Sequence, residues 1–457
     1  MTLQKIRTKS TGHLTSLERD IFAKLVDQSN SNFRVKAGSV ADVSLEALDP
    51  GAIVYNEADG KIYFCDDEWW NPAGVPIKLK VVYTDTQFAF KFKAPSGSTL
   101  QIYDGDGTLT PVAGNDAGLV THNTSYAAAG TYYFYVEGDY LDLTVLNIAG
   151  QSFVSGDISG YGVLTNLTFL LMNFTGMYGN IEVLRTCTEL TILSATNNVG
   201  IYGDASRLDT FGNITLSLYN TAITFDSVVT MTKTDKSYEY GSSSGLTSAM
   251  IDNIFNSYAA STGMRIQVWN NSSLRTAASS AAILTLIQAG NKVGFDYVGL
   301  SLGSLGSELH IDANAASDPN ANEANAVTGW TPTGLSGSNE FVSQEVEKSV
   351  GNYAFKAQCN GTPTSNANFA KSFTVDSGSI YRIVNTWKHI GSGGTWGMWL
   401  YGGAFAQMQV YDLDWQKLES YYKATDTSFE VKFIEYSVTN DGGVYVDDIS
   451  FRKLTPS

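Results

Sequence analysis

A short apolar phrase recurs four times between Leu141 and Thr230, and this repetition constrains the fold more than any other feature of the chain. Its copies are Leu143-Thr-Val-Leu146, Leu167-Thr-Phe-Leu170, Leu190-Thr-Ile-Leu193 and Ile214-Thr-Leu-Ser217, which begin 24, 23 and 24 residues apart. A second phrase follows the first three in step: Gly156-Asp157-Ile158, Gly179-Asn180-Ile181 and Gly203-Asp204-Ala205. Two phrases in register predict a stacked solenoid, because each unit can bury its apolar edge only against its neighbours.

The period and the Leu-x-x-Leu spacing resemble those of a leucine-rich repeat. The resemblance implies an inward-facing Asn in each unit, which Asn173 and Asn197 match loosely. The alternative is a sandwich whose Leu- and Thr-rich strands happen to be evenly spaced. The repeat carries no recurring acid, His or Cys at its inward positions, so it predicts a scaffold and no reaction.

The segment after the fourth copy is expected to close the solenoid at residue 298. Thr247 is placed to cap a helix, and a strand follows over Met264–Trp269. A second helix is predicted around the apolar residues Ile283, Leu284, Leu286 and Ile287. This order is what a terminal cap requires, and it resembles the closing unit of leucine-rich-repeat proteins of phages and bacteria of the Bacteroidota.

Residues 1–75 are expected to form an N-terminal docking or oligomerisation region. Thr15 and Glu18 have the spacing of a capping box at the start of an amphipathic helix. A hairpin around Asp59-Gly60 follows, and it resembles a short module near the N-termini of bacteriophage fibre and tail proteins. The helix packs either on a sister subunit or docking protein, or on its own neighbouring domain. The residues predicted to make the oligomer or docking contact are Leu17, Ile21, Phe22, Leu25, Trp69 and Trp70.

Residues 76–140 predict a small β-sandwich, in which Phe88, Phe90 and Phe92 form the buried face of one strand. The Asp104-Gly-Asp106-Gly turn and the later Ala129-Gly-Thr-Tyr strand resemble the polycystic-kidney-disease (PKD) type of immunoglobulin-like domain. The two acids suggest a calcium loop, but the closing Glu of an EF-hand is missing, which favours a plain turn.

A Gly- and Ser-rich stretch over 299–307 predicts a flexible linker, and residues 308–457 predict a final β domain. Gly329-Trp330, Gly351-Asn-Tyr-Ala-Phe355 and Val446-Asp-Asp-Ile-Ser450 resemble phrases of the galactose-binding-like jelly roll of carbohydrate-binding modules. The resemblance implies a structural calcium ion, with Asp447 or Asp448 beside a ligand such as Glu308 or Asp312.

The richest aromatic cluster of the chain is Trp396, Trp399 and Tyr401, in a Gly-rich stretch. Two interpretations are open: a surface on which sugar rings stack, or core beside a glycine hairpin. If Trp396 and Trp399 share a strand, they lie on opposite faces, so at most one of the two faces a ligand.

The composition excludes several classes of partner. The formal charge of −16 argues against DNA and RNA, which need a concentrated basic surface, and disfavours anionic polysaccharides. The three cysteines, Cys65, Cys187 and Cys359, lie far apart and predict neither a zinc site nor a disulfide framework. No apolar run approaches the roughly 18 residues that a membrane span needs. The N-terminus lacks the apolar stretch of a secretory signal, so we expect a particle component made in the host cytoplasm and released by lysis.

Motifs of catalysis are also missing, because the four His have no metal-binding spacing and the chain carries no Gly-x-Ser-x-Gly or phosphate-binding loop. The sequence therefore predicts a mainly β, multidomain, non-enzymatic protein that requires no cofactor. It resembles a phage virion component: a head fibre, tail fibre or tail-associated adhesin of a Bacteroidota phage. The resemblance implies virion-protein partners, homotrimers, and contact with a host-surface glycan or protein. The alternatives are a bacterial cell-surface adhesin and an accessory protein of a polysaccharide depolymerase.

Overall fold

The protein is described by a computed structural model of its 457 residues. The described parts are residues 35–38, 53–56, 61–65, 70–72, 77–84, 87–106, 108–241, 245–269, 271–300, 302–312, 331–333, 340–344, 354–358, 368–390, 396–401, 408–410, 416–435 and 443–456. Leu17, Ile21, Phe22, Leu25 and Trp69 lie outside these parts, and Trp70 begins a strand. Their role in docking or oligomerisation stays a prediction.

The chain divides into two compact units. The first comprises residues 1–88, 96–114 and 123–140, and the second comprises 89–95, 115–122 and 141–457. The segment predicted as one PKD-like sandwich, residues 76–140, therefore contributes strands to both units. The solenoid and the C-terminal β domain, which the sequence separates by a linker, belong to the same unit.

The first unit contains two sheets. The smaller has the order β1-β2-β3-β4, and the antiparallel register of β2 with β3 confirms the predicted hairpin. In the other, β5, β10, β7 and β8 are neighbours in that order. Alternating side chains of β5, namely Ile77, Leu79 and Val81, are buried, as expected for a strand with one face on a core. The strands are β1 Val35–Gly38, β2 Ile53–Asn56, β3 Lys61–Cys65, β4 Trp70–Pro72, β5 Ile77–Tyr83, β7 Thr99–Tyr103, β8 Leu109–Ala113 and β10 Gly130–Gly138, followed by the 3-10 turn η4 Tyr140–Asp142.

Strand β6 (Phe88–Lys93) contains the predicted aromatic face. Phe88, Phe90 and Phe92 are all fully buried, and the residues between them are partly or fully exposed, which confirms the period-2 prediction. Within the second unit β6 pairs antiparallel with β11 (Val145–Asn147), the first strand of the repeat, with Phe92 opposite Leu146. A strand that precedes the repeat thus covers the open end of the solenoid sheet.

The repeat forms a solenoid with two parallel ladders. One ladder is β11-β13-β15-β17-β19-β20-β21, and the other is β12-β14-β16-β18. Three-residue and six-residue 3-10 turns join the ladders in successive coils. The elements are β12 Val154–Asp157, η5 Tyr161–Val163, β13 Phe169–Leu171, β14 Gly176–Asn180, η6 Ile181–Thr186, β15 Ile192–Ser194, β16 Gly200–Asp204, η7 Ala205–Thr210, β17 Thr215–Ser217, β18 Ala222–Thr224 and β19 Ser237–Gly241. Strand β9 (Val120–Thr124) lies beside β6 at the start of the first ladder.

The register of the parallel strands shows which residue of each repeat occupies the same position in successive coils. Leu146, Leu170 and Leu193 lie opposite one another and are fully buried, as the first three phrases predict. The residue opposite Leu193 in the next coil is Leu216. Alignment of the fourth phrase with the first three predicts Ser217 there, so the fourth phrase is displaced by one residue. The physical reason is that the core needs an apolar side chain there, and Leu216 supplies one.

Each coil turns at a residue with left-handed backbone, with φ of +76° at Gly150, +56° at Phe174, +61° at Asn197 and +53° at Asn220. The following residue closes the turn, because its side chain donates a hydrogen bond to the carbonyl oxygen three residues earlier. The donors are Gln151, Thr175, Asn198 and Thr221, and the acceptors are Ile148, Met172, Ala195 and Leu218. The inward Asn of the third coil is therefore Asn198, and Asn197 holds the left-handed turn.

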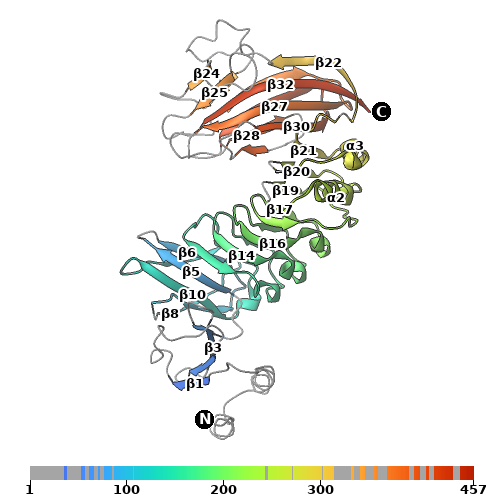
Figure 1. Ribbon diagram of the computed structural model, residues 1–457. Coiled ribbons are helices and arrows are strands. Elements are labelled where there is room, and N and C mark those ends of the chain that lie inside the picture. Colours follow the sequence, from blue (N-terminus) through green and yellow to red (C-terminus); the bar gives the residue numbers. More distant parts are fainter. Residues whose placement is uncertain are drawn as a thin grey trace. The chain divides into compact units, whose positions relative to one another are not determined.

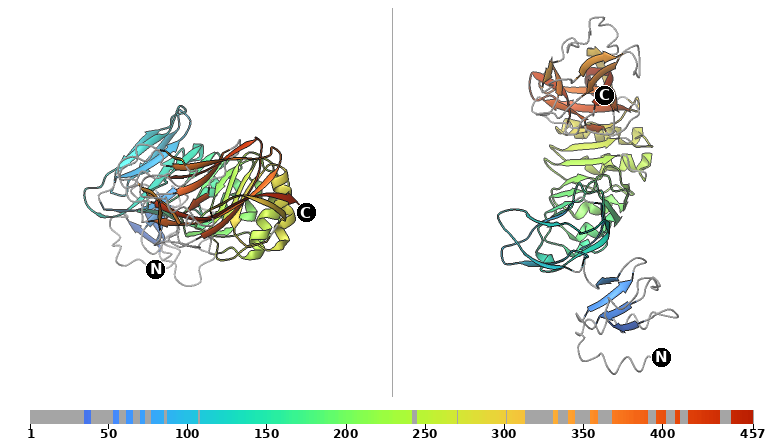
Figure 2. Two further views of the ribbon diagram at one scale, coloured as in Figure 1. Left: turned by 90° about the horizontal axis from the view of Figure 1, so that it is seen from above. Right: turned by 90° about the vertical axis from the view of Figure 1, so that its left-hand side faces the viewer.

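The expected cap is present. Thr247 accepts a hydrogen bond from the backbone N–H of Met250 at the start of α2 (Ser248–Tyr258), and α3 (Ser280–Gln288) buries Ile283, Leu286 and Ile287. β20 (Arg265–Trp269) and β21 (Lys292–Asp296) extend the first ladder, and η8 (Ala277–Ser279) precedes α3. Figure 1 shows α2 and α3 stacked beside these strands, and the right view of Figure 2 shows the same yellow helices on one side of the coils.

The cap does not end the sheet. β21 pairs antiparallel with β30 (Gln416–Lys423), with Val293 opposite Tyr421 and Phe295 opposite Glu419 (Figure 1). In the described part of the chain one sheet of 15 strands therefore includes both the solenoid ladder and a sheet of the C-terminal domain. The row of core side chains that begins at Leu146 continues through Val293 to Tyr421, all nearly fully buried.

The C-terminal domain contributes β30, β27, β32, β25 and β24 to this sheet and has a second sheet of order β23-β26-β31-β28-β29. Between the two sheets, Phe451 stacks on Phe429 and contacts the tilted ring of Phe373. The chain is thus mainly β with few helices, in large mixed sheets. The strands are β22 Gly303–Asp312, β23 Thr331–Thr333, β24 Glu340–Gln344, β25 Ala354–Gln358, β26 Asn368–Thr374, β27 Ile380–Ile390, β28 Trp396–Tyr401, β29 Met408–Val410, β31 Ser428–Glu435 and β32 Gly443–Pro456. Residues 303–307 of the expected linker form the first half of β22, which pairs with β32.

Candidate functional site

The predicted sugar-stacking residues lie on one strand. Trp396, Trp399 and Tyr401 belong to β28, between β31 and β29 in the second sheet of the C-terminal domain. Trp399 is opposite Lys432, and Tyr401 is opposite Glu430. The two tryptophans are three residues apart on one strand, which is the condition under which at most one of them faces a ligand. The preceding Gly-rich residues 391–395 lie outside the described residues.

The predicted calcium ligands lie on two neighbouring strands. Glu308 and Asp312 belong to β22, and Asp447 and Asp448 belong to β32, which pairs antiparallel with β22. Asp312 is opposite Ile449, so the register brings its backbone next to that of Asp448, whereas Glu308 is opposite Arg452. Among the side chains that the structure describes, no group of three or more His, Cys, Asp or Glu could hold a metal ion, and these four lie outside that set. The calcium site stays a prediction.

The Asp-Gly-Asp-Gly segment of the first unit is a turn. Gly105 has a φ of +83°, and Asp106 accepts a hydrogen bond from the backbone N–H of Thr108. Asp104 is buried and accepts a hydrogen bond from the hydroxyl of Thr124, at 2.6 Å. Both carboxylates serve the local structure, in agreement with the plain turn that the sequence favours.

Cys187, the cysteine whose side chain the structure describes, is not an activated nucleophile. Cys187 is fully buried inside the solenoid and donates a hydrogen bond to the carbonyl oxygen of Tyr161. Burial raises the pKa of its thiol to about 11, against a small opposing effect of Thr186. A thiol in such surroundings stays protonated at neutral pH and is inert.

In the described part of the chain, a group of partly and fully buried charged and aromatic residues lies where the cap meets the C-terminal domain. We call it the junction cluster. It comprises Arg275 and Phe295 of the cap, Tyr297, and Arg382, Lys417, Glu419 and Tyr421 of the C-terminal domain.

Glu419 is the centre of the junction cluster. Its side chain is fully buried, and Oε1 accepts hydrogen bonds from Arg382 Nε at 2.7 Å and from the hydroxyl of Tyr421 at 2.5 Å. Burial lowers the pKa of Arg382, but the hydrogen bond and charge of Glu419 outweigh it and raise that pKa overall. Burial also raises the pKa of Tyr421, and the Glu419 carboxylate adds to the shift. The phenol therefore stays protonated and remains a donor to Glu419.

The cap side of the junction cluster adds a second cation. Arg275 is buried, and its guanidinium carbon lies 4.4 Å from the ring centre of Phe295. Its pKa is lowered by burial, which Glu419 partly offsets. The Arg382 guanidinium carbon and the Lys417 ammonium each lie over the ring of Tyr297, at 5.4 and 4.6 Å from its centre. The arrangement therefore joins two parts of the chain through ion pairing, hydrogen bonding and cation–π contacts.

No local sequence pattern predicts the junction cluster. Its central strand, β30, has no alternating pattern, because both of its faces are buried: Leu418, Glu419, Ser420, Tyr421 and Tyr422 are all nearly inaccessible. One signal was available, since Glu419 shares a short strand with Leu418, Tyr421 and Tyr422, and an acid that is buried among such residues is almost always paired.

Glu239, on strand β19 of the solenoid, is a partly buried acid. Glu239 Oε2 accepts a hydrogen bond from the hydroxyl of Ser217 at 2.7 Å, and that hydroxyl also lies 2.7 Å from the Thr196 hydroxyl. Burial raises the pKa of Glu239 above its ordinary value of 4.5, although Ser217 and the charge of Arg265 oppose the shift. The folded protein therefore binds this proton more tightly than the unfolded chain does.

Glu239→Gln is expected to raise the melting temperature at pH 8 and to leave it unchanged near pH 4. The stability that the raised pKa provides is complete below about pH 4.5 and is lost as pH rises through the folded-state pKa. Gln keeps an acceptor for Ser217 without the buried charge. Calorimetry at both pH values, with exposed Glu189→Gln as control, measures the effect. An equal or lower melting temperature of the variant at pH 8 would contradict it.

No helix in the described part of the chain is long and apolar enough to span a membrane.

Comparison with known proteins gives structural likenesses only. No family model and no curated protein matches the chain, whereas 59 chains of known structure do. One is TmCBM61, solved in complex with β-1,4-galactotriose, at 15% identity and a TM-score of 0.24, covering 28% of this chain and 91% of that one. Another is the CBM22-1 xylan-binding domain of Paenibacillus barcinonensis Xyn10C, at 15% identity and a TM-score of 0.25, covering 35% of this chain and all of that one. The chain therefore has a distant similarity to β-sandwich carbohydrate-binding modules over about a third of its length.

Proposed function

We propose that this protein is a non-enzymatic scaffold that holds a glycan-contacting β-sandwich at the end of a stiff solenoid. The observation that carries the proposal is the pairing of β21 with β30, reinforced by the junction cluster. A binding module on a flexible linker needs no such shared sheet, whereas a module that must be held in a fixed direction does. The core row from Leu146 to Tyr421 supports the same conclusion.

The proposed place of action is a phage virion, as a head fibre, tail fibre or tail-associated adhesin made in the host cytoplasm. Residues 1–75 would attach it to other virion proteins and join a homotrimer. The support is the N-terminal hairpin phrase, the charge of −16 and the scaffold-like repeat. Mass spectrometry of purified particles tests this part. Recovery of the protein in the bacterial envelope and not in particles would favour the cell-surface adhesin.

The proposed contact surface is β28. Replacing the ligand-facing tryptophan by Ala, as Trp396→Ala or Trp399→Ala in the full chain, is expected to weaken glycan binding by about 30-fold or more, the effect of losing an aromatic hot spot. Only one of the two variants should do so without unfolding, because alternate residues of a strand face opposite sides. The other should lower stability.

A glycan array and a host-cell adsorption assay with the full chain measure this effect. Lys453→Ala is the control, since Lys453 is exposed and pairs with exposed Asp376. Unchanged binding by both tryptophan variants would remove β28 from the proposal. Release of reducing ends from purified capsule by the wild-type chain would contradict the non-enzymatic assignment.

A further inference from the structure

The second ladder of the solenoid displays two exposed tyrosines in a repeated setting. Tyr178 of β14 and Tyr202 of β16 are 51% and 53% exposed, although they lie in the middle of ordered strands. Most large side chains of the solenoid strands are buried, and these two point to the opposite face from Met177 and Ile201, which fill the core.

The register places each tyrosine between a polar and a small residue. Across the ladder, Tyr178 lies opposite Asp157 on one side and Gly200 on the other. Tyr202 lies opposite Asn180 on one side and Ala222 on the other. Two successive coils thus present the same order of a polar side chain, an aromatic ring and a small residue. We call these two rows the tyrosine ladder.

Gly200 is required by this arrangement. A Cβ atom at Gly200 would lie 2.6 Å from the Cβ of Tyr178, closer than real side chains come. Because Gly200 has no side chain and that of Ala222 is a single methyl group, neither can cover a neighbouring tyrosine. Both tyrosine side chains keep about half of their surface exposed beside these small residues.

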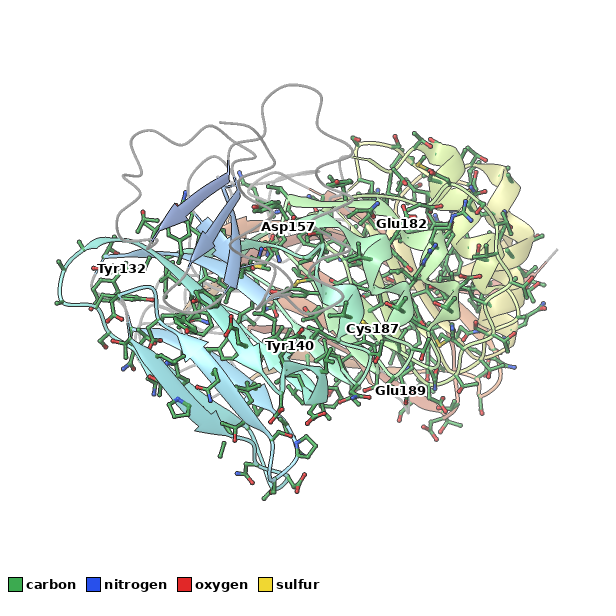
Figure 3. The ribbon with its side chains drawn as sticks, turned by 90° about the horizontal axis from the view of Figure 1, so that it is seen from below. Tyr132, Tyr140, Asp157, Glu182, Cys187 and Glu189 are labelled. Carbon is green, nitrogen blue, oxygen red and sulfur yellow. The ribbon has the colours of Figure 1, made fainter. Side chains whose placement is uncertain are left out.

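The polar members keep hydrogen-bonding capacity. Asp157 is exposed, and its two carboxylate oxygens accept from the backbone N–H and the hydroxyl of Ser159, which leaves further lone pairs on both. Asn180 Oδ1 accepts from the backbone N–H of Glu182, and that cap does not use the amide Nδ2 donors. Figure 3 labels Asp157 and Glu182 on the side of the solenoid away from Cys187 and Glu189.

A strained aromatic residue precedes the tyrosine ladder. Phe174, two residues before β14, has a φ of +56° and is 42% exposed. The equivalent turn positions hold Gly150, Asn197 and Asn220, which adopt left-handed backbone at little cost. A bulky side chain kept exposed at a strained position is typical of a site under functional selection.

We infer that the tyrosine ladder is a binding site for a neutral glycan chain, separate from β28. Neighbouring strands are about 4.8 Å apart and two residues along a strand span roughly 6.6 Å, so the two Cβ atoms are roughly 8 Å apart. Flat rings at a fixed spacing, each beside a hydrogen-bonding side chain, suit successive sugar rings, which present apolar C–H faces and polar edges. The only formal charge in the two rows is that of Asp157, and the chain carries −16 overall, which disfavours an anionic glycan.

A protein partner fits this surface less well. A specific protein interface takes about 20 to 30 residues from each side, with an apolar centre depleted in charge. The tyrosine ladder offers two rings, with Asp157 inside one row and Asn180 inside the other. A small flat surface with two aromatic rings and polar side chains beside them suits a sugar chain better than a protein.

The inference is tested with the full chain and oligosaccharides from neutral galactan, xylan and β-glucan, by calorimetric titration. Tyr178→Ala/Tyr202→Ala is expected to weaken binding of at least one of them about tenfold or more. Tyr178→Phe/Tyr202→Phe, which keeps both rings, should stay within about threefold of the wild type. Melting curves of both double variants exclude a general loss of fold.

The outcomes distinguish this site from the proposed function. Binding that is lost in the β28 variants and unchanged in Tyr178→Ala/Tyr202→Ala overturns the inference and leaves the proposed function standing. Binding that is lost only in the tyrosine variant supports the inference and removes β28. Wild-type protein that binds none of the probes at millimolar concentration overturns the inference. A change of oligomeric state in light scattering, with unaltered titration, identifies a protein interface and also overturns it.

Discussion

Asn198→Ala is expected to lower the free energy of unfolding by roughly 3 to 6 kcal/mol, because it leaves several buried polar groups without partners. Asn198 is buried, and its Oδ1 accepts from the Thr175 hydroxyl and the backbone N–H of Met177. Its Nδ2 donates to the carbonyl oxygens of Met172 and Ala195. One side chain therefore connects two neighbouring coils at a nearly inaccessible site.

Asn198→Thr is the matched variant, since Thr175 and Thr221 occupy the equivalent turn position in neighbouring coils. Thr keeps the hydrogen bond to the carbonyl oxygen of Ala195 and loses the contacts to the preceding coil, so its effect should be about half that of Ala. Urea unfolding followed by circular dichroism measures both. Equal stabilities of the Ala variant and of exposed Asn166→Ala would contradict the prediction.

Arg382→Ala is the second large effect, expected at about 3 to 5 kcal/mol, the cost of leaving a buried charge unpaired. The Glu419 side chain is fully buried, and Arg382 holds its Oε1 at 2.7 Å. Arg275 lies nearby but has its own desolvation cost, so it compensates only in part. The loss should appear in the transition that unfolds the cap and the C-terminal domain together.

The double variant Arg382→Met/Glu419→Met is expected to recover most of that loss, because replacing a whole buried pair by apolar side chains is often neutral. Lys453→Ala is the control on an exposed ion pair and should produce no measurable change. Differential scanning calorimetry measures all three variants. A double variant as unstable as Arg382→Ala would show that packing, and not the unpaired charge, is responsible.

The sequence predicts those parts of the fold whose signal is local. Leu146, Leu170 and Leu193 recur at a constant period, so the solenoid and its register follow from spacing alone. Thr247 and the apolar stripes of α2 and α3 predict the cap in the same way. The sequence does not locate the inward position to a single residue where two neighbouring residues fit the repeat about equally well. Asn197 and Asn198 are one such pair, and Leu216 and Ser217 are another.

Local sequence patterns do not predict which strands pair when they lie far apart in the sequence. Val293 and Tyr421 meet although they are 128 residues apart, and neither β21 nor β30 carries a mark of its partner. The Gly- and Ser-rich stretch suggests flexibility, yet β22 begins at Gly303, because backbone groups beside β32 gain more from a ladder than from solvent. The tyrosine ladder also depends on register, since Gly200 has meaning only once it lies opposite Tyr178.

The pairing of β21 with β30 also bears on how the protein avoids aggregation. A solenoid sheet has two terminal strands whose free N–H and C=O groups invite pairing with another chain. Here β6 protects the first strand and β30 protects the last, each antiparallel to the ladder that it closes. The C-terminal domain therefore covers the last strand of the solenoid sheet and protects it from pairing with another chain. A fragment that stops at residue 298 would expose the edge of β21 and is expected to aggregate.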